Sequence, residues 1–147
     1  MLRPGTKAPE IDLPDQHGER FRLSALSGRK NVVVYFYPKD DTPVCTAEAC
    51  GFRDKYERFK DKDTEVIGIS KDDMGSHGRF AARHSLPFPL LTDATGEVHK
   101  AYDVGSFLVL WQQRITYVVG KDGIIRGATK AMFDADRHVE EALRSLP

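Results

Sequence analysis

The two cysteines of this chain, Cys45 and Cys50, lie five residues apart at the predicted junction of a strand and a helix. An apolar run over residues 31–37 precedes them, and a polar turn separates that run from Cys45. A thiol in the first turn of a helix favours the thiolate, because unpaired N–H groups and the helix dipole stabilise an anion there. The thiolate is the nucleophilic form of cysteine, so this layout predicts a thiol-based redox site.

Thr42 and Pro43 mark the predicted start of the helix. Thr42 is expected at the N-cap and Pro43 at the first helical position, where proline is tolerated best. Cys45 is then the third residue of a helix over residues 43–60. The helix is predicted to present one apolar face, made of Phe52, Tyr56 and Phe59. An inert buried cysteine is the alternative, and the cap, the proline and the helical position together disfavour it.

The second thiol, Cys50, is too far from Cys45 to bridge it within an intact helix. Residues five apart in an ideal helix have Cα atoms about 9 Å apart, whereas a disulfide needs about 7 Å or less. A bridge therefore requires the first turns to unwind. We expect a folded reduced state and a locally unfolded oxidised state. The alternative is that Cys50 packs as a small apolar residue and does not react.

The string that runs from Tyr37 to Cys50 resembles the active-site motif of peroxiredoxins, with the pattern Pro38-x-x-x-Thr42-x-x-Cys45. The longer string is similar to that of the bacterioferritin-comigratory, or peroxiredoxin Q, subgroup. Weaker similarities cover most of the chain, among them Gly5-x-x-Ala8-Pro9, Phe88-Pro89-Leu90-Leu91-x-Asp93 and an arginine before a strand, Arg114. The resemblance implies a thioredoxin-like fold and a thiol peroxidase that reduces hydrogen peroxide and organic hydroperoxides.

The resemblance also implies a role for each matched residue. Cys45 is expected to attack the hydroperoxide and become a sulfenic acid, and Cys50 to resolve it as an intramolecular disulfide. A thioredoxin-like dithiol then restores both thiols. Thr42 is expected to hydrogen-bond the peroxide through its hydroxyl, as a donor to the leaving oxygen. Pro38 is expected to shield the site from water, and Arg114 to stabilise the thiolate and orient the peroxide.

Glu48 follows Cys45 by one helical turn on the same face. A bare carboxylate at that position would disfavour the thiolate. Glu48 therefore either faces solvent or pairs with an arginine and positions it, and we favour the pairing.

Two features depart from the subgroup's pattern. Val44 stands where the subgroup usually has glycine, and it crowds the approach to the nucleophile. Residues 107–111, which include Trp111, are more apolar than expected before the arginine. They form either a wall of the substrate pocket or a contact surface, or else a buried loop or strand. A monomer is expected, and this apolar stretch leaves a dimer as the alternative.

The composition excludes several classes of function. The chain has 147 residues, with 22 basic and 22 acidic side chains, which predicts a single domain over residues 1–147 and no nucleic-acid or anionic membrane partner. The apolar runs are far shorter than a membrane span, and the first residues lack the apolar core of a signal peptide. We therefore expect a cytoplasmic protein, in which two cysteines are more often catalytic or metal-binding than structural.

Neither a cofactor nor a metal is expected. The sequence has no glycine-rich phosphate loop. A zinc site needs about four ligands, and the five histidines are scattered along the chain. Each is expected at the surface or at a helix cap; they are His17, His77, His84, His99 and His138.

The order of the predicted elements favours an α/β fold with a central mixed sheet flanked by helices. The elements are an N-terminal hairpin over 11–23, a helical turn at 23–26, strands at 31–37 and 65–70, helices at 43–60, 76–84, 97–102 and 135–146, and a second hairpin over 114–128.

Two other functions use the same cysteines. A thiol–disulfide oxidoreductase usually carries Cys-x-x-Cys, which is absent here. A redox sensor would unfold its helix on oxidation and present that surface to a partner. Turnover separates these hypotheses, because a sensor oxidises once whereas a peroxidase cycles with a reductant.

Overall fold

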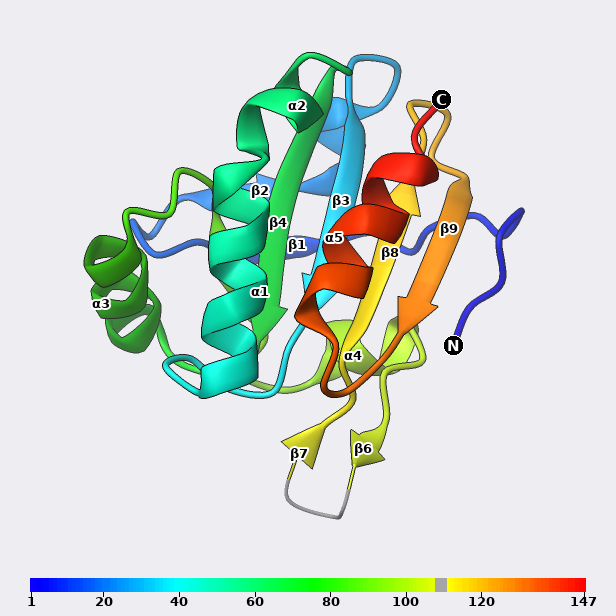
Figure 1. The fold of residues 1–147 in the computed structure, drawn as a ribbon. Coiled ribbons are helices and arrows are strands. Elements are labelled where there is room, and N and C mark those ends of the chain that lie inside the picture. The colour runs from blue at the N-terminus through cyan, green and yellow to red at the C-terminus, as the bar shows by residue number, and fades with distance from the viewer. Residues whose placement is uncertain (108–110) are drawn as a thin grey trace.

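The computed structural model describes residues 1–107 and 111–147, and a five-stranded mixed sheet lies at its centre (Figure 1). The strands are ordered β5-β4-β3-β8-β9, with bounds Leu90–Thr92, Thr64–Ser70, Asn31–Phe36, Ile115–Val119 and Ile125–Lys130. β4 pairs in parallel with both β3 and β5, whereas β8 is antiparallel to β3 and to β9. The prediction of a central mixed sheet is confirmed.

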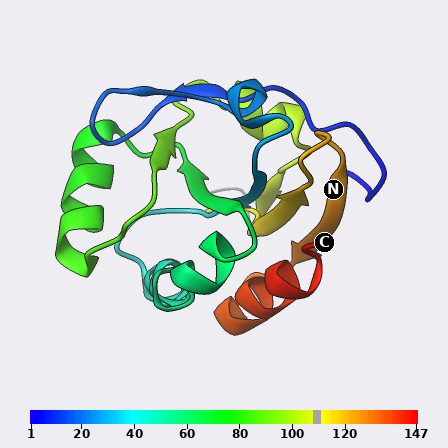
Figure 2. The ribbon, with the colours of Figure 1, turned by 90° about the horizontal axis from the view of Figure 1, so that it is seen from above.

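Three helices cover one side of the sheet, and the N-terminal hairpin and a short helix cover the other (Figure 2). The helices are α1 (Pro43–Asp54), α2 (Tyr56–Lys60), α3 (Met74–His84), α4 (Glu97–Ala101) and α5 (Ala135–Arg144). α1, α2 and α5 lie on one side of the sheet, and α4 lies with the hairpin on the other. The predicted hairpin consists of β1 (Asp12–Pro14) and β2 (Arg20–Arg22), which are antiparallel and lead into a short 3-10 helix, Leu23–Leu26.

The central strand β3 is buried on both faces, which explains why its sequence shows no polar alternation. Its side chains enter two separate cores. Val33 and Tyr35 pack with α1 and α5, whereas Val34 and Phe36 pack toward the hairpin side. β3 ends at Phe36, and the chain turns over residues 37–42 before α1 begins at Pro43.

The predicted helix over residues 43–60 is interrupted at Lys55, where α1 ends and α2 begins. In a straight helix, residues seven apart are about 10.5 Å apart along the axis. The rings of Phe52 and Phe59 nevertheless lie 5.8 Å apart, centroid to centroid, in one core. The interruption lets both rings pack in the core that also contains Val66 of β4.

Residues 106–112 contain a pair of short antiparallel strands that the sequence did not predict, β6 (Ser106–Phe107) and β7 (Trp111–Gln112). The hypotheses for the apolar residues 107–111 concern side chains outside the described part of the structure.

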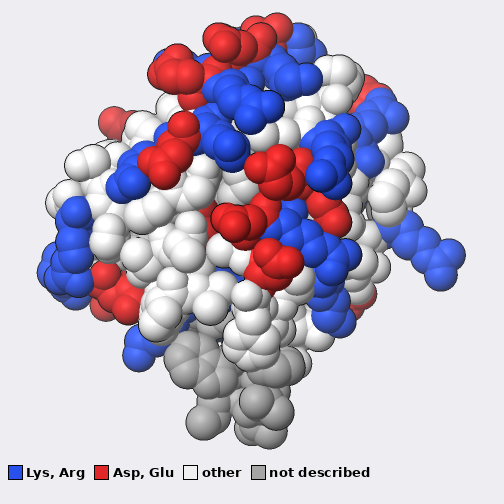
Figure 3. Space-filling view, in the orientation of Figure 1, with Lys and Arg blue, Asp and Glu red and all other residues white. Residues whose placement is uncertain are grey.

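Charged side chains of both signs are intermixed over the face formed by α1, α2 and α5, as expected for a chain without net charge (Figure 3). Among the residues that the structure describes, none of the helices has both the length and the apolar character to cross a membrane.

Two glycines test how tightly the layers pack. A Cβ added at Gly68 in β4 would lie 2.7 Å from Tyr35 and 3.0 Å from Leu90, so Gly68→Ala is expected to cost about 1–3 kcal/mol. Gly78 in α3 has open space, so Gly78→Ala is expected to gain up to about 1 kcal/mol through helix propensity. Urea unfolding of both variants checks this, and equal stabilities would contradict the packing described.

Candidate active site

Cys45 is the third residue of α1, as predicted, and its side chain is buried, with 1% of its surface exposed. Thr42 occupies the N-cap position and Pro43 the first helical position. The expected capping bond is absent, however: the Thr42 hydroxyl donates to the carbonyl of Lys39 at 2.8 Å instead. The left-handed conformation of Asp41, with φ of 60°, closes a tight turn that makes this carbonyl available.

The pairing of β8 with β3 brings Arg114 next to Cys45. It immediately precedes β8, and Ile115 of β8 pairs with Phe36 at the end of β3. The guanidinium therefore stands where α1 begins, although Arg114 and Cys45 are 69 residues apart in the chain. Its Nη2 donates to Cys45 Sγ at 3.2 Å.

Two further hydrogen bonds hold the Arg114 guanidinium in place. Nη1 donates to Glu48 Oε1 at 2.7 Å, and Nε donates to the carbonyl of Met132 at 2.9 Å. Arg114 is only 3% exposed and Glu48 is fully buried. The structure thus shows Glu48 paired with Arg114, one of the two arrangements considered from the sequence.

Burial and charge set the ionisation of this pair. Burial raises the pKa of Glu48 to about 7, and the Arg114 guanidinium offsets only part of that effect. For Arg114, burial lowers the pKa, but Glu48 and Cys45 outweigh it and hold the pKa above its usual value. A permanently charged guanidinium therefore faces two groups, Cys45 and Glu48, that can each become an anion.

His138 of α5 lies behind Glu48 and is fully buried. Its Nε2 lies 2.7 Å from the carbonyl of Ala131, and its Nδ1 lies 2.7 Å from the hydroxyl of Thr116. Nδ1 is also 3.5 Å from Glu48 Oε2. Burial lowers the pKa of His138 to about 4, against the raising effect of the Ala131 hydrogen bond, so the imidazole is neutral at pH 7.

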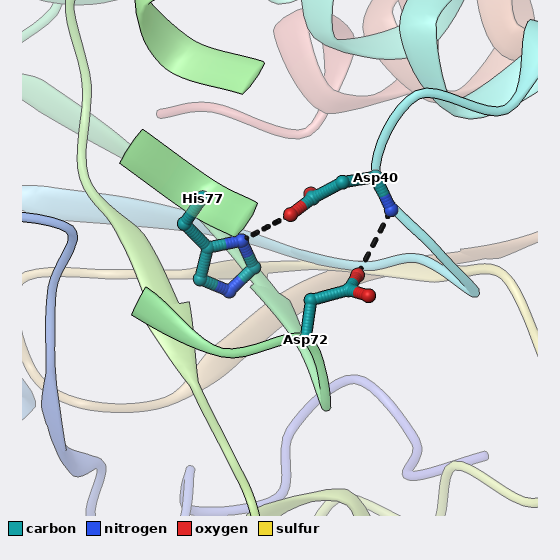
Figure 4. Close-up of side chains that lie close together, drawn as sticks. All are labelled: Asp40, Asp72 and His77. Carbon is teal, nitrogen blue, oxygen red and sulfur yellow. Dashed lines mark hydrogen bonds and ion pairs between the residues drawn. The ribbon is translucent and has the colours of Figure 1, made fainter. Parts of the chain in front are cut away.

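A second buried network anchors the turn that precedes Cys45 (Figure 4). Asp40 Oδ2 lies 2.7 Å from Nδ1 of His77, and Oδ1 accepts a hydrogen bond from Tyr37 at 2.5 Å. Asp72 accepts from the backbone N–H of Asp40 at 2.8 Å and from the Ser70 hydroxyl at 2.7 Å. The network ties the turn to α3 and to the end of β4.

The same three residues, Asp40, Asp72 and His77, could in principle hold a metal ion, because one ligand atom from each lies within 4.8 Å of the others. Both Asp40 oxygens already accept hydrogen bonds, and Nε2 of His77 lies 3.1 Å from the carbonyl of Leu91, which can only accept. Hydrogen bonding therefore accounts for the cluster without an ion.

The prediction that every histidine lies at the surface or at a cap is wrong for His77, His99 and His138, since all three are buried. His99 Nδ1 lies 2.6 Å from Asp93 Oδ2. His17 is exposed and His84 half-buried. A usable signal existed, because His77 and His138 lie on the apolar faces of α3 and α5, where a histidine must be buried with partners.

The remaining candidate residues lie around the same turn. Pro38 follows β3 and is half-buried, and Val44 is half-buried in the first turn of α1 beside Cys45. Cys50 is half-buried on the same intact helix, and both thiols are free. The catalytic roles of these residues and the unwinding needed for a disulfide stay predictions.

A model of the AhpC/TSA family matches residues 4–128. The chloroplastic peroxiredoxin Q of rice (Oryza sativa subsp. japonica) is 45% identical over 143 residues, which are 97% of this chain and 65% of the rice protein. The chain therefore spans slightly less than two thirds of the length of this relative.

Two solved structures are similar over nearly their whole length. Peroxidoxin BcpB from Mycobacterium tuberculosis has a TM-score of 0.92 at 34% identity, covering 99% of this chain and 97% of that one. The bacterioferritin comigratory protein of Xanthomonas campestris, studied for its alkyl peroxide reduction activity, has a TM-score of 0.85 at 28% identity, covering 92% and 89%.

Asp40 and its neighbour Asp41 make a matched test of the anchoring network. In Asp40→Asn an amide NH2 group, which can only donate, replaces one carboxylate oxygen that accepts hydrogen bonds. The substitution is expected to lower the free energy of unfolding by about 3 kcal/mol or more. Asp41 forms an exposed pair with Arg83, so Asp41→Asn is expected to cost no more than about 1 kcal/mol. Unfolding in urea measures both, and equally small losses would show that the network does not hold the turn.

The lowered pKa of His138 predicts a pH dependence of stability. Since the folded value of about 4 lies below the ordinary 6.5, His138 stabilises the fold above pH 6.5, and this is lost as pH falls toward 4. His138→Gln removes the effect, so the stability difference between the parent and the variant should shrink by about 3 kcal/mol from pH 7 to pH 4. His17→Gln, at an exposed position, is the control. Parallel pH curves for the parent and His138→Gln would refute the assignment.

Proposed function

The chain belongs to the AhpC/TSA family of peroxiredoxins, and we propose that it is a thiol peroxidase that reduces hydrogen peroxide and organic hydroperoxides. The observation that carries the proposal is the contact between the Arg114 guanidinium and Cys45 Sγ in the first turn of α1. The helix terminus and a fixed cation both favour the thiolate. The alkyl peroxide reduction studied for the X. campestris protein supports organic hydroperoxides as substrates.

In the first step, the Cys45 thiolate attacks the terminal oxygen of the hydroperoxide. An S–O bond forms, the O–O bond breaks, and the product is a sulfenic acid that retains the hydrogen of the terminal oxygen. The other oxygen leaves as an alkoxide or hydroxide and takes up a proton. Negative charge develops on that oxygen, and a preorganised guanidinium such as that of Arg114 lowers the barrier.

Thr42 is assigned a different role from the one expected from the sequence. Because its hydroxyl hydrogen is committed to the carbonyl of Lys39, its oxygen is left as an acceptor. We therefore assign Thr42 to accept the O–H of the hydroperoxide, which orients the terminal oxygen toward sulfur. Stabilisation of the leaving oxygen falls to Arg114 and the helix N-terminus, while Pro38 limits access of water.

Cys50 completes the cycle. Its thiol condenses with the sulfenic acid of Cys45, releasing water and forming an intramolecular disulfide, after the first turns of α1 have unwound. A dithiol reductant of the thioredoxin type then reduces the disulfide. A cytoplasmic location, a single domain over residues 1–147 and a monomeric state stay predictions; the cycle itself requires a compartment that keeps such a reductant reduced.

Rapid mixing with one equivalent of hydrogen peroxide, followed by mass measurement, tests the proposal. The reduced chain is expected to consume peroxide within the enzymatic range of about 10⁴–10⁸ M⁻¹s⁻¹, with loss of two hydrogens. Cys45→Ser is expected to abolish consumption, and Cys50→Ser to allow one fast oxidation without a disulfide. A rate like that of a free thiol would refute the proposal. Fast oxidation without turnover by a dithiol would favour the redox sensor.

A further inference from the structure

The two oxygens of the buried Glu48 carboxyl have different surroundings. Oε1 accepts the hydrogen bond from Arg114, whereas Oε2 has no hydrogen-bond partner among the described residues. A buried carboxylate oxygen without a donor is costly. Nδ1 of His138 lies 3.5 Å from Oε2.

The orientation of His138 determines what Oε2 meets. The carbonyl of Ala131 can only accept, so Nε2 of His138 carries the hydrogen and donates it at 2.7 Å. In the neutral ring Nδ1 then presents a lone pair, which accepts from the Thr116 hydroxyl and lies beside Glu48 Oε2. Nδ1 therefore has no hydrogen to donate to Oε2, and its partial negative charge disfavours an ionised carboxylate more than a protonated one.

The charges around Glu48 favour the same state. The groups that face it are Cys45 on its own helix, Tyr35 on β3, Arg114 before β8 and His138 on α5. Arg137 and Glu141 of α5 act on His138 with opposite signs. Arg114 is the cation in this group, and one cation cannot balance two buried anions. Ionisation of Cys45 and ionisation of Glu48 therefore oppose each other.

We propose that His138 is a positioning residue that keeps Glu48 protonated, so that the charge of Arg114 is available to the Cys45 thiolate. The exchange conserves protons and charge: the S–H bond of Cys45 breaks and an O–H bond forms on Glu48, giving a thiolate and a carboxylic acid. Glu48 thus stores the proton that Cys45 releases. The inference rests on the proposed function and assigns the residues that prepare its nucleophile.

A double-mutant cycle in a Cys50→Ser background, which leaves one thiol, tests this coupling. Thiolate formation is followed by its ultraviolet absorbance across pH. In His138→Gln the side-chain amide can turn its N–H group to Glu48 and stabilise the ionised carboxylate, which the neutral ring cannot do, so the substitution is expected to move the midpoint of thiolate formation upward by about one pH unit, a tenfold change. In the Glu48→Gln background the same substitution is expected to cause no shift. Glu140→Gln, an exposed change on α5, is the control.

Infrared spectroscopy reads the proton on Glu48 directly and needs no change at His138. The reduced Cys50→Ser protein at neutral pH is expected to show a band of a protonated carboxyl that disappears in Glu48→Gln. An ionised Glu48 in this spectrum would overturn the inference even if His138→Gln failed to fold. So would an equal midpoint shift in both backgrounds of the cycle.

These readouts separate the inference from the proposed function. If the Cys50→Ser protein reacted with hydroperoxide no faster than a free thiol, the proposed function would fail. The thiolate titration and the infrared spectrum would still decide whether His138 controls the proton on Glu48.

Discussion

A single buried guanidinium, that of Arg114, is the constraint on which the arrangement of this molecule depends. Moving a cation out of water costs several kcal/mol unless its hydrogens find acceptors. Arg114 finds them in Cys45 Sγ, Glu48 Oε1 and the carbonyl of Met132. These acceptors come from α1 and from the segment between β9 and α5, so the cation is satisfied only when these two segments and β8 have come together. Catalytic geometry and folding are thus coupled through one side chain.

The two sides of Cys45 differ in how firmly they are held. The turn before it is fixed by buried hydrogen bonds through Asp40, whereas α1 after it is held by apolar contacts of Ala49 and Phe52 and by the bonds to Arg114. In the proposed cycle, conversion of the Cys45 thiolate into a neutral sulfenic acid removes the anion that balances Arg114. Oxidation is therefore expected to weaken the contact that holds the start of α1, while the turn before Cys45 keeps its own hydrogen bonds through Asp40.

The sequence predicted those parts of the site that depend on neighbours along the chain. The apolar run of β3, the proline at the start of α1 and the position of Cys45 follow from local rules, and the structure places them as expected. Arg114 came only from the resemblance, because its contact with Cys45 depends on the pairing of β8 with β3. The bond of the Thr42 hydroxyl was missed because the left-handed Asp41 brings a competing carbonyl within reach.

The buried histidines show why polar networks escape prediction from sequence. His77 and His138 are held alike: in each, Nε2 donates to a backbone carbonyl and Nδ1 faces a side chain. At His77 that side chain is the Asp40 carboxyl, 2.7 Å away, and the contact anchors the turn before Cys45. At His138 it is the Thr116 hydroxyl, which leaves the ring neutral beside Glu48. The tertiary partner of Nδ1, which no local pattern specifies, therefore decides whether a buried histidine anchors a turn, as His77 does, or lies as a neutral ring beside the Glu48 carboxyl, as His138 does.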